Sequence, residues 1–133
     1  MKKITKKLFS TAVLSLLVSS TLASQKPEKT QGLEVTILES FELKKQIPVM
    51  DGYELRTRRT IIQAGGTIVE HSHTNRPGVV YVLDGSMTEH KGDITRVINA
   101  GETWIESFDT THWLENTSGK PSTILSVDLV LKK

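Results

Sequence analysis

The sequence of 133 residues contains no cysteine. Disulfide bonds, thiolate metal sites and thiol nucleophiles are therefore excluded, so the fold depends on its hydrophobic core or on a metal bound by other side chains. The sequence also lacks a phosphate-binding glycine loop, a Ser/His/Asp spacing and a paired-carboxylate arrangement. These absences leave nucleotide-binding, serine-hydrolase and glycosidase functions without support.

Acidic residues are missing from residues 1–23, which have the features of a secretory signal peptide. Four lysines among the first seven residues precede an apolar run, Leu8–Leu22, which is interrupted only by Ser and Thr and ends at the small residues Ala23 and Ser24. A basic head, a short apolar body and a small-residue exit are typical of such a signal, and the run is too short for a typical membrane span. We expect cleavage after Ala23 and an exported protein, periplasmic or secreted; the alternative is a retained membrane anchor.

Removal of residues 1–23 changes the sign of the net charge. The full chain carries 17 basic and 15 acidic residues, and the removed segment contains four of the basic residues and none of the acidic ones. The mature chain therefore has a net charge near −2 instead of +2. A basic face for nucleic acid is not implied, and no membrane contact is expected after cleavage.

The mature chain, about 110 residues, has the size of one domain. Residues 24–32 are polar and are interpreted as a flexible lead-in to a single domain over residues 33–133. Short segments rich in Val, Ile, Thr and aromatic residues alternate there with turns that contain Gly or Asp, and no window shows a helical stripe. We expect strands over residues 33–39, 54–63, 67–73, 79–83, 86–90, 94–99, 103–106, 112–116 and 122–131.

This pattern predicts an all-β fold, a sandwich or a small barrel. The pairs Asp84-Gly85 and Gly92-Asp93 are typical of two-residue hairpin turns. Four aromatic side chains interrupt strands and are expected in the core or at a subunit interface: Tyr81, Trp104, Phe108 and Trp113.

Four histidines are the main candidates for chemistry: His71, His73, His90 and His112. His71 and His73 are two residues apart in an expected strand, so their side chains leave the same face and can converge on one ion. For an isolated His-x-His pattern, the alternative is two surface or hydrogen-bonded histidines. His90 lies close to the Gly92-Asp93 turn and is interpreted as an exposed turn residue.

Glycines and an asparagine surround the histidines at defined spacings in two motifs. The first motif contains Gly65, His71, His73 and Gly85, and the second contains Gly101, His112 and Asn116. This arrangement resembles the cupin family, whose motifs read G-x5-H-x-H-x3,4-E-x6-G and G-x5-P-x-G-x2-H-x3-N, and the resemblance covers residues 33–131. It implies a double-stranded β-helix (jelly-roll) barrel of two antiparallel sheets that holds an ion through its three motif histidines, and it points to a homodimer.

The sequence departs from the family pattern at several positions. The glutamate ligand of the first motif falls at Gly78, which has no side chain, and the neighbouring Pro77 cannot replace it. In the second motif, Ser107 and Asp109 stand where proline and glycine are expected. Asp109 is a candidate to gate or bind a substrate at the barrel mouth, with an ordinary turn residue as the alternative.

Three neutral imidazoles still suit Fe, Mn, Zn, Ni or Cu. Some metal-dependent cupins, thiol dioxygenases among them, work with three histidines and no carboxylate. A divalent ion in such a site keeps a net charge of +2 and prefers an anionic co-ligand. Glu106 is a candidate acidic fourth ligand or an acceptor for an imidazole N–H, with a solvent-facing strand end as the alternative. Glu70 faces away from His71 and is excluded as a ligand.

The functional hypothesis is an exported metal-binding cupin that acts on a small anionic molecule as an oxygenase, isomerase or lyase. The alternatives are a non-catalytic module that binds a metal or small ligand, and a metal-free structural barrel. Arg56, Arg58 and Arg59 are interpreted as a solvated strand face, with a clamp for a substrate anion as the alternative.

Overall fold

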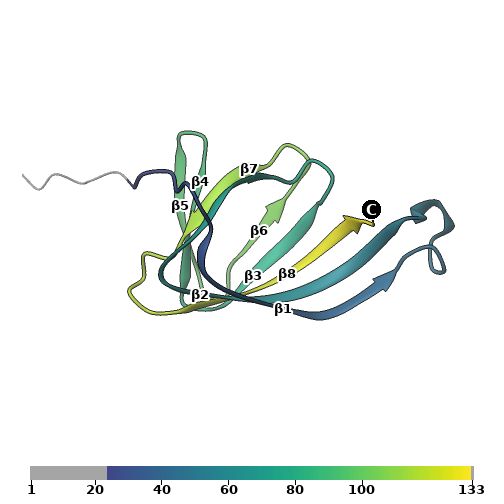
Figure 1. The fold of residues 1–133 in the computed structure, drawn as a ribbon, viewed down its shortest axis with the longest axis horizontal. Helices are drawn as coiled ribbons and strands as arrows, with labels where there is room; N and C mark the ends of the chain where they lie inside the picture. Colours follow the sequence, from purple (N-terminus) through teal and green to yellow (C-terminus); the bar gives the residue numbers. More distant parts are fainter. Residues whose placement is uncertain (1–23, 133) are drawn as a thin grey trace, which may run out of the picture.

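A computed structural model describes residues 24–132, so the predicted signal peptide lies outside the described residues. The described part confirms the all-β prediction (Figure 1). Its elements are β1 (Gln31–Glu42), η1 (Pro48–Met50), β2 (Tyr53–Ser72), β3 (Gly78–Asp84), β4 (Ser86–Lys91), β5 (Ile94–Asn99), β6 (Thr103–Glu106), β7 (Thr111–Glu115) and β8 (Ser122–Leu131). Within residues 24–132, no helix has the length and hydropathy needed to cross a membrane.

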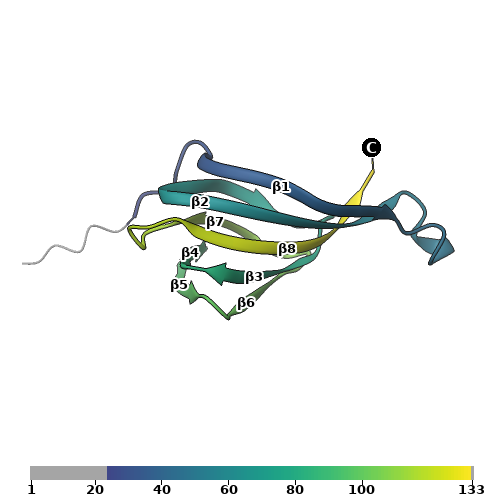
Figure 2. The same cartoon turned by 90° about the horizontal axis from the view of Figure 1, so that it is seen from below.

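Antiparallel pairing joins the strands in the order β5-β4-β7-β2-β8-β3-β6, and β1 pairs with the free side of β2. The strands curl into a nearly closed barrel, and β1 and β2 continue beyond it as a hairpin that contains η1 in its turn (Figure 1, Figure 2). This is the jelly-roll architecture that the family resemblance implies.

The long strand β2 belongs to both sides of the barrel, because its first part pairs with β8 and its last part pairs with β7. Gly65, with φ +74°, and Gly66 lie where β2 changes partner. A Cβ on Gly66 would lie 2.8 Å from Cγ2 of Ile62, so the close backbone approach requires glycine. The strands expected over 54–63 and 67–73 are therefore one bent strand, which carries its C-terminal end across to β7.

The two predicted hairpin turns have different outcomes. Gly92-Asp93 joins β4 and β5, which pair directly, and this prediction is confirmed. The hairpin prediction at Asp84-Gly85 is wrong, because β3 pairs with β6 and β8, whereas β4 pairs with β5 and β7. The chain instead passes between the two sides of the barrel at Gly85, where Ser122 holds the crossing by accepting a hydrogen bond from the Ser86 amide and donating one to its carbonyl.

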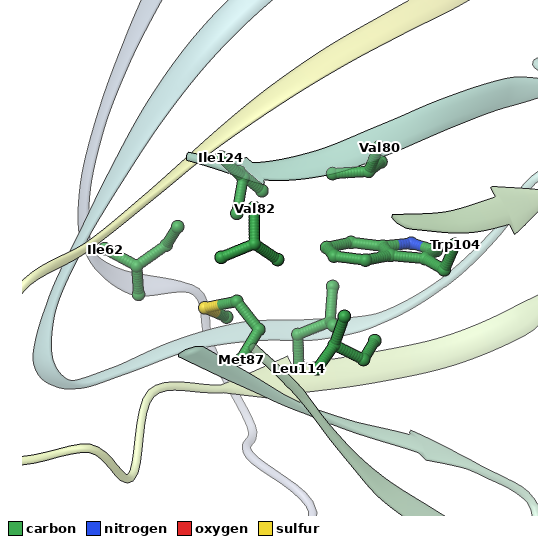
Figure 3. Close-up of a cluster of buried hydrophobic side chains, with 8 residues drawn as sticks. Ile62, Val80, Val82, Met87, Trp104, Leu114 and Ile124 are labelled. Carbon is green, nitrogen blue, oxygen red and sulfur yellow. The ribbon is translucent and has the colours of Figure 1, made fainter. Parts of the chain in front are cut away.

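The barrel interior is apolar at one end and polar at the other. Along β8 the inward residues change from Ile124, which neighbours Val82, to Asp128, which neighbours Gly78. The buried apolar cluster consists of Ile62, Val80, Val82, Met87, Ile98, Trp104, Leu114 and Ile124 (Figure 3). Each large aliphatic side chain of this kind contributes roughly 1.5–3 kcal/mol by burial. The apolar end thus stabilises the barrel and leaves the polar end for a site.

The four strand-interrupting aromatic residues divide into two pairs. Trp104 and Trp113 are buried, as expected of core residues. Tyr81 on β3 and Phe108 in the turn between β6 and β7 are exposed. The core interpretation is therefore wrong for these two residues, and the subunit-interface interpretation stays a prediction.

Asn116, the last residue of the second motif, is buried and structural. Its Nδ2 donates hydrogen bonds to the carbonyls of Ile62 and Lys120, and its Oδ1 accepts one from the Ser118 amide. These bonds fix the loop before β8, so the residue links the end of one motif to the strand that carries the other.

Candidate metal centre

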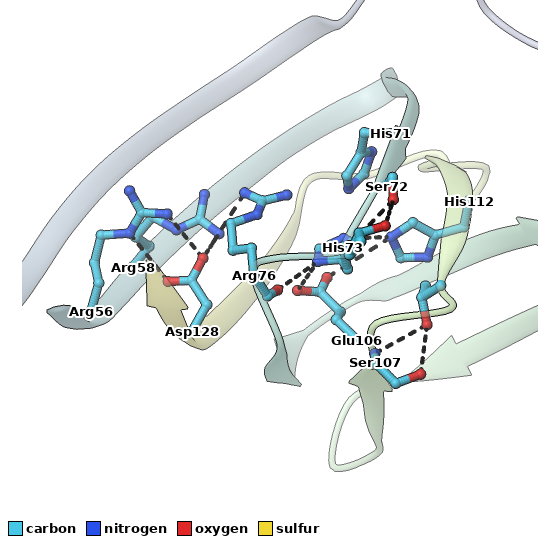
Figure 4. Close-up of polar contacts among 12 residues, drawn as sticks. Arg56, Arg58, His71, Ser72, His73, Arg76, Glu106, Ser107, His112 and Asp128 are labelled. Carbon is cyan, nitrogen blue, oxygen red and sulfur yellow. Dashed lines mark hydrogen bonds and ion pairs between the residues drawn. The ribbon is translucent and has the colours of Figure 1, made fainter. Parts of the chain in front are cut away.

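Three histidines from β2 and β7 meet at the polar end of the barrel. His71 lies directly opposite His112 in the β2–β7 pairing, and His73 follows immediately after the end of β2. The ring centroids are 4.8 Å apart for His71 with either partner and 5.0 Å apart for His73 and His112. His73 and His112 are fully buried, and His71 is half-buried. The structure therefore brings together the three histidines that the sequence motifs single out (Figure 4).

Each of the three rings has an oxygen acceptor at Nδ1. Nδ1 of His71 lies 2.9 Å from the Val69 carbonyl, Nδ1 of His73 lies 3.1 Å from the Arg76 carbonyl, and Nδ1 of His112 lies 2.7 Å from the Glu89 carboxylate. These acceptors assign the ring proton to Nδ1, which then donates. All three Nε2 atoms consequently carry the free lone pair that a metal ion requires.

The Nε2 atoms converge on one another. Nε2 of His73 lies 3.1 Å from Nε2 of His112, and the candidate ligand atoms of all three residues lie within 4.8 Å of one another. Nitrogen ligands about 2.0–2.1 Å from one ion lie about 3–4 Å apart. Two unprotonated nitrogens at 3.1 Å repel each other, and a cation between them removes that repulsion. The donor set therefore fits a metal ion.

Burial keeps these imidazoles neutral. It lowers the pKa of His73 to about 4 and also lowers the pKa of His71. A neutral ring is the form that ligates a metal, so near pH 7 neither residue has to lose a proton before it binds an ion.

Glu106, at the end of β6, is buried beside the histidines. Its Oε2 lies 3.2 Å from Nδ1 of His73, and its Oε1 lies 3.9 Å from Nε2 of His112. Oε2 is buried without a hydrogen-bond partner in residues 24–132, and burial raises the pKa of the carboxyl group. A cation in the histidine cluster would stabilise the ionised carboxylate. The solvent-facing alternative for Glu106 is wrong, because β6 turns this side chain into the barrel.

Gly78, where the family motif has its glutamate, lies beside Glu106. The two residues are opposite each other in the β3–β6 pairing. A Cβ at position 78 would lie 2.9 Å from the Val127 carbonyl oxygen, 3.0 Å from Cβ of Asp128 and 3.3 Å from Oε2 of Glu106. The family glutamate would thus occupy the space that Glu106 fills from the neighbouring strand.

Glu89 on β4 contacts the Nδ1 side of His112, and it was not identified as a candidate from the sequence. One carboxylate oxygen accepts the Nδ1 proton of His112, and the other accepts a hydrogen bond from Nε of Arg96. Burial alone would raise the pKa of Glu89, but the bonds from His112 and Arg96 outweigh burial and lower it. Alternation along β4 could have revealed this residue, because Glu89 follows the buried Met87 by two positions.

The other candidate residues lie away from the histidine cluster. His90 stacks on Trp113, with ring centroids 3.6 Å apart, and its Nε2 lies 2.8 Å from the Glu115 carboxylate. It is therefore not the exposed turn residue that the sequence suggested. Asp109 is exposed and accepts a hydrogen bond from Ser107 within its own turn.

A cavity of about 240 Å³ opens beside the histidines. Its polar lining includes His71, His73, Glu106 and two arginines, Arg58 and Arg76. Its apolar lining includes Leu33, Ile68, Trp104, Leu114 and Ile124. A small molecule in this cavity would contact both the candidate metal ligands and positive charge.

The prediction that Arg56, Arg58 and Arg59 form a solvated strand face is wrong for Arg56 and Arg58. Arg56 and Arg58 point into the barrel and pair with the buried Asp128, whereas Arg59 is exposed. Arg56, Arg58 and Thr60 are two residues apart along β2, so their side chains leave the same face of the strand. This face is the one toward the cavity.

Comparisons with known proteins agree with this architecture. Residues 58–128 match the family model Cupin_2, a cupin domain. A predicted oxalate decarboxylase from Thermotoga maritima is 23% identical, with a TM-score of 0.60 over 74% of this chain and 81% of that one. The Cupin_2 domain of an XRE family transcriptional regulator from Enterobacter cloacae is 17% identical, with a TM-score of 0.57 over 74% of this chain and 96% of that one.

A third solved structure, a protein with a double-stranded β-helix domain from Klebsiella pneumoniae, is 16% identical, with a TM-score of 0.59 over 80% of this chain and 90% of that one. No curated protein matches the sequence. At these identities, the solved structures establish only the shared fold.

Proposed function

The chain belongs to the Cupin_2 domain family, whose model matches more than half of its residues, and from this premise we propose that it binds one divalent transition metal through His71, His73 and His112. The observation that carries the proposal is the convergence of three Nε2 lone pairs whose Nδ1 protons are held by oxygen acceptors. Imidazole ligands suit Fe, Mn, Zn, Ni or Cu.

Glu106 is proposed as the fourth protein ligand. A carboxylate there would offset part of the ion's charge, and its Oε1 is 3.9 Å from Nε2 of His112. Glu89 holds His112 in the ligating tautomer, as a second carboxylate often does for metal-bound imidazoles.

The proposed function is chemistry on a small anionic molecule in the adjacent cavity, as an oxygenase, isomerase or lyase. A bound ion would supply Lewis-acid or redox chemistry and at least one open coordination position. The chain would contribute orientation through Arg58 and Arg76, and exclusion of water through the apolar lining around Trp104. A binding module without turnover remains the second candidate, because the same ligand set and cavity serve both functions.

The test is metal analysis of the purified mature protein together with single alanine variants. We expect about one ion per chain in the wild type and loss of most of the metal in His71→Ala, His73→Ala and His112→Ala. His90→Ala is the matched control, because His90 is also partly buried and carboxylate-bonded but lies outside the cluster. Retention of metal by His112→Ala together with loss in His90→Ala would overturn the ligand assignment. Oxygen uptake with small thiols, diketones and hydroxy acids then detects an oxygenase, and chromatography of the same mixtures detects isomerisation or cleavage. No conversion in either assay favours a binding module.

We also propose export with removal of residues 1–23, to the periplasm or beyond the cell. The basic head, apolar body and small exit residues of this segment support the proposal. The intact mass of the exported protein tests it: a mass that begins at Ser24 is expected, and a mass that still includes Lys2–Leu22 would favour a retained anchor.

A homodimer is proposed from the outer face of β3, β6 and β8. Apolar side chains are exposed there on neighbouring strands: Val79, Tyr81, Ile105 and Val127. An apolar face of this kind is typical of an interaction surface. Light scattering is expected to give twice the mature mass, and a clean monomer would refute the dimer without affecting the metal site.

A further inference from the structure

Two arginines share the cavity with the candidate metal ligands. Arg58 comes from β2, and Arg76 comes from the segment between β2 and β3. Both gather around Asp128, to one side of the histidines (Figure 4). A molecule that reaches the metal from this cavity therefore lies next to two guanidinium groups.

The positive charge of this group exceeds the charge of its carboxylate partner. Arg56 binds Asp128 through two bonds, with Nε 3.1 Å from Oδ1 and Nη2 2.9 Å from Oδ2. Nη2 of Arg58 lies 2.9 Å from Oδ2, and Nη1 of Arg76 lies 4.0 Å from it. Three cations thus share one fully buried carboxylate, and two positive charges are not compensated by it.

One donor of this group has no partner. Nε of Arg58 is buried and makes no hydrogen bond within residues 24–132, although the same atom of Arg56 binds Asp128. Buried N–H donors are nearly always satisfied, and a missing partner indicates an unfilled contact. A carboxylate is the acceptor that matches the planar donor pair of a guanidinium group.

We propose that the cavity binds a small dicarboxylate, with one carboxylate on the metal ion and the other on Nε of Arg58 beside Arg76. This inference rests on the proposed metal site and names its substrate class. The cavity of about 240 Å³ has room for a molecule of a few carbon atoms. The apolar walls accommodate the carbon chain between the two acid groups.

The test is calorimetric titration of the zinc-loaded mature protein with acetate, oxalate, malonate, succinate and glutarate. We expect one dicarboxylate to bind at least tenfold more tightly than acetate. In Arg58→Met, that dicarboxylate should bind about tenfold to a hundredfold more weakly, since a charge-assisted hydrogen bond is lost. Acetate, which needs only the metal, should change less than about threefold. Arg59→Met is the matched control, because Arg59 is the exposed neighbour on the same strand.

A second variant guards against loss of folding in Arg58→Met. Arg76 is more exposed and lies farther from Asp128, so Arg76→Met should keep the fold and still weaken the dicarboxylate severalfold. Unchanged dicarboxylate affinity in both variants, or equal losses for acetate and dicarboxylate, would overturn the inference. Zinc binding without any preference for a dicarboxylate would overturn it while the proposed metal site stands. Failure of the wild type to bind zinc would overturn both.

Discussion

Glu89 offers a sensitive probe of the metal centre, because it contacts the candidate ligand His112 and is not itself a proposed ligand. In Glu89→Gln, one amide oxygen must replace two carboxylate oxygens that accept from His112 and Arg96. The amide NH2 group then faces one of these donors, and a charge-assisted bond of 2.7 Å to Nδ1 becomes a neutral one or disappears. His112 is held less firmly in the ligating tautomer.

The expected loss of zinc affinity is about 10- to 100-fold, the usual effect of removing a group that orients a metal-bound histidine. This loss corresponds to about 1.4–2.7 kcal/mol of binding free energy. Competition with a chelator of known affinity at pH 7.5 measures it, and thermal unfolding of the metal-free protein shows whether the fold is retained.

Glu115→Gln is the matched control for this experiment. Glu115 contacts Nε2 of His90 at 2.8 Å, a carboxylate–histidine pair of the same kind outside the cluster. Zinc affinity should be unchanged in this variant. If Glu89→Gln binds zinc within twofold of the wild type, or if Glu115→Gln loses as much affinity, Glu89 does not position a metal ligand.

Three further predictions follow from the same geometry. Glu106→Gln should weaken zinc binding about tenfold or more, because a charged oxygen ligand is replaced by a neutral one; an unchanged chelator competition curve would contradict this. Because the pKa of His73 falls to about 4 in the fold from about 6.5 unfolded, its stabilising contribution is complete above pH 6.5 and is lost as the pH falls toward 4. Urea unfolding of the metal-free protein should therefore show a larger loss of stability between pH 7.5 and 4.5 in the wild type than in His73→Gln, and equal losses would refute the shift. Gly78→Ala should destabilise the protein by about 1–3 kcal/mol through overpacking, and an unchanged urea midpoint would show that the strands separate there at little cost.

The sequence predicted the fold class and identified the three histidines of the cluster. Strand alternation places two side chains of a His-x-His pattern together, and the second motif supplies His112 at its family spacing. The pairing of β2 with β7, which sets His71 opposite His112, depends on contacts between distant parts of the chain. No local pattern encodes that register.

The incorrect predictions concern features that depend on contacts between residues far apart in the sequence. Asp84-Gly85 has the composition of a hairpin turn, but the flanking strands pair with other partners, so the turn becomes a crossing between the two sides of the barrel. The arginine-rich sequence of β2 is typical of a solvated strand face. Arg56 and Arg58 nevertheless face inward, because they pair with Asp128, which is 70 residues away from Arg58 in the sequence. Long-range ion pairs of this kind are not visible in the sequence of one strand.

The proposed role of Glu106 is to compensate for the glutamate ligand that the family motif has at position 78. Glycine at position 78 removes the family ligand, and only the β3–β6 register shows that Glu106 faces the same space. The spacing of Glu106 before His112 made it a candidate, but its burial and distances came from the fold.

Anomalous X-ray diffraction at the absorption edge of the bound metal tests the central claim most directly. The account predicts one strong peak per chain about 2.0–2.2 Å from Nε2 of His71, His73 and His112, with a Glu106 oxygen on the same ion. A peak at His90 and Glu115 instead, or no peak in crystals grown with excess metal, would contradict it.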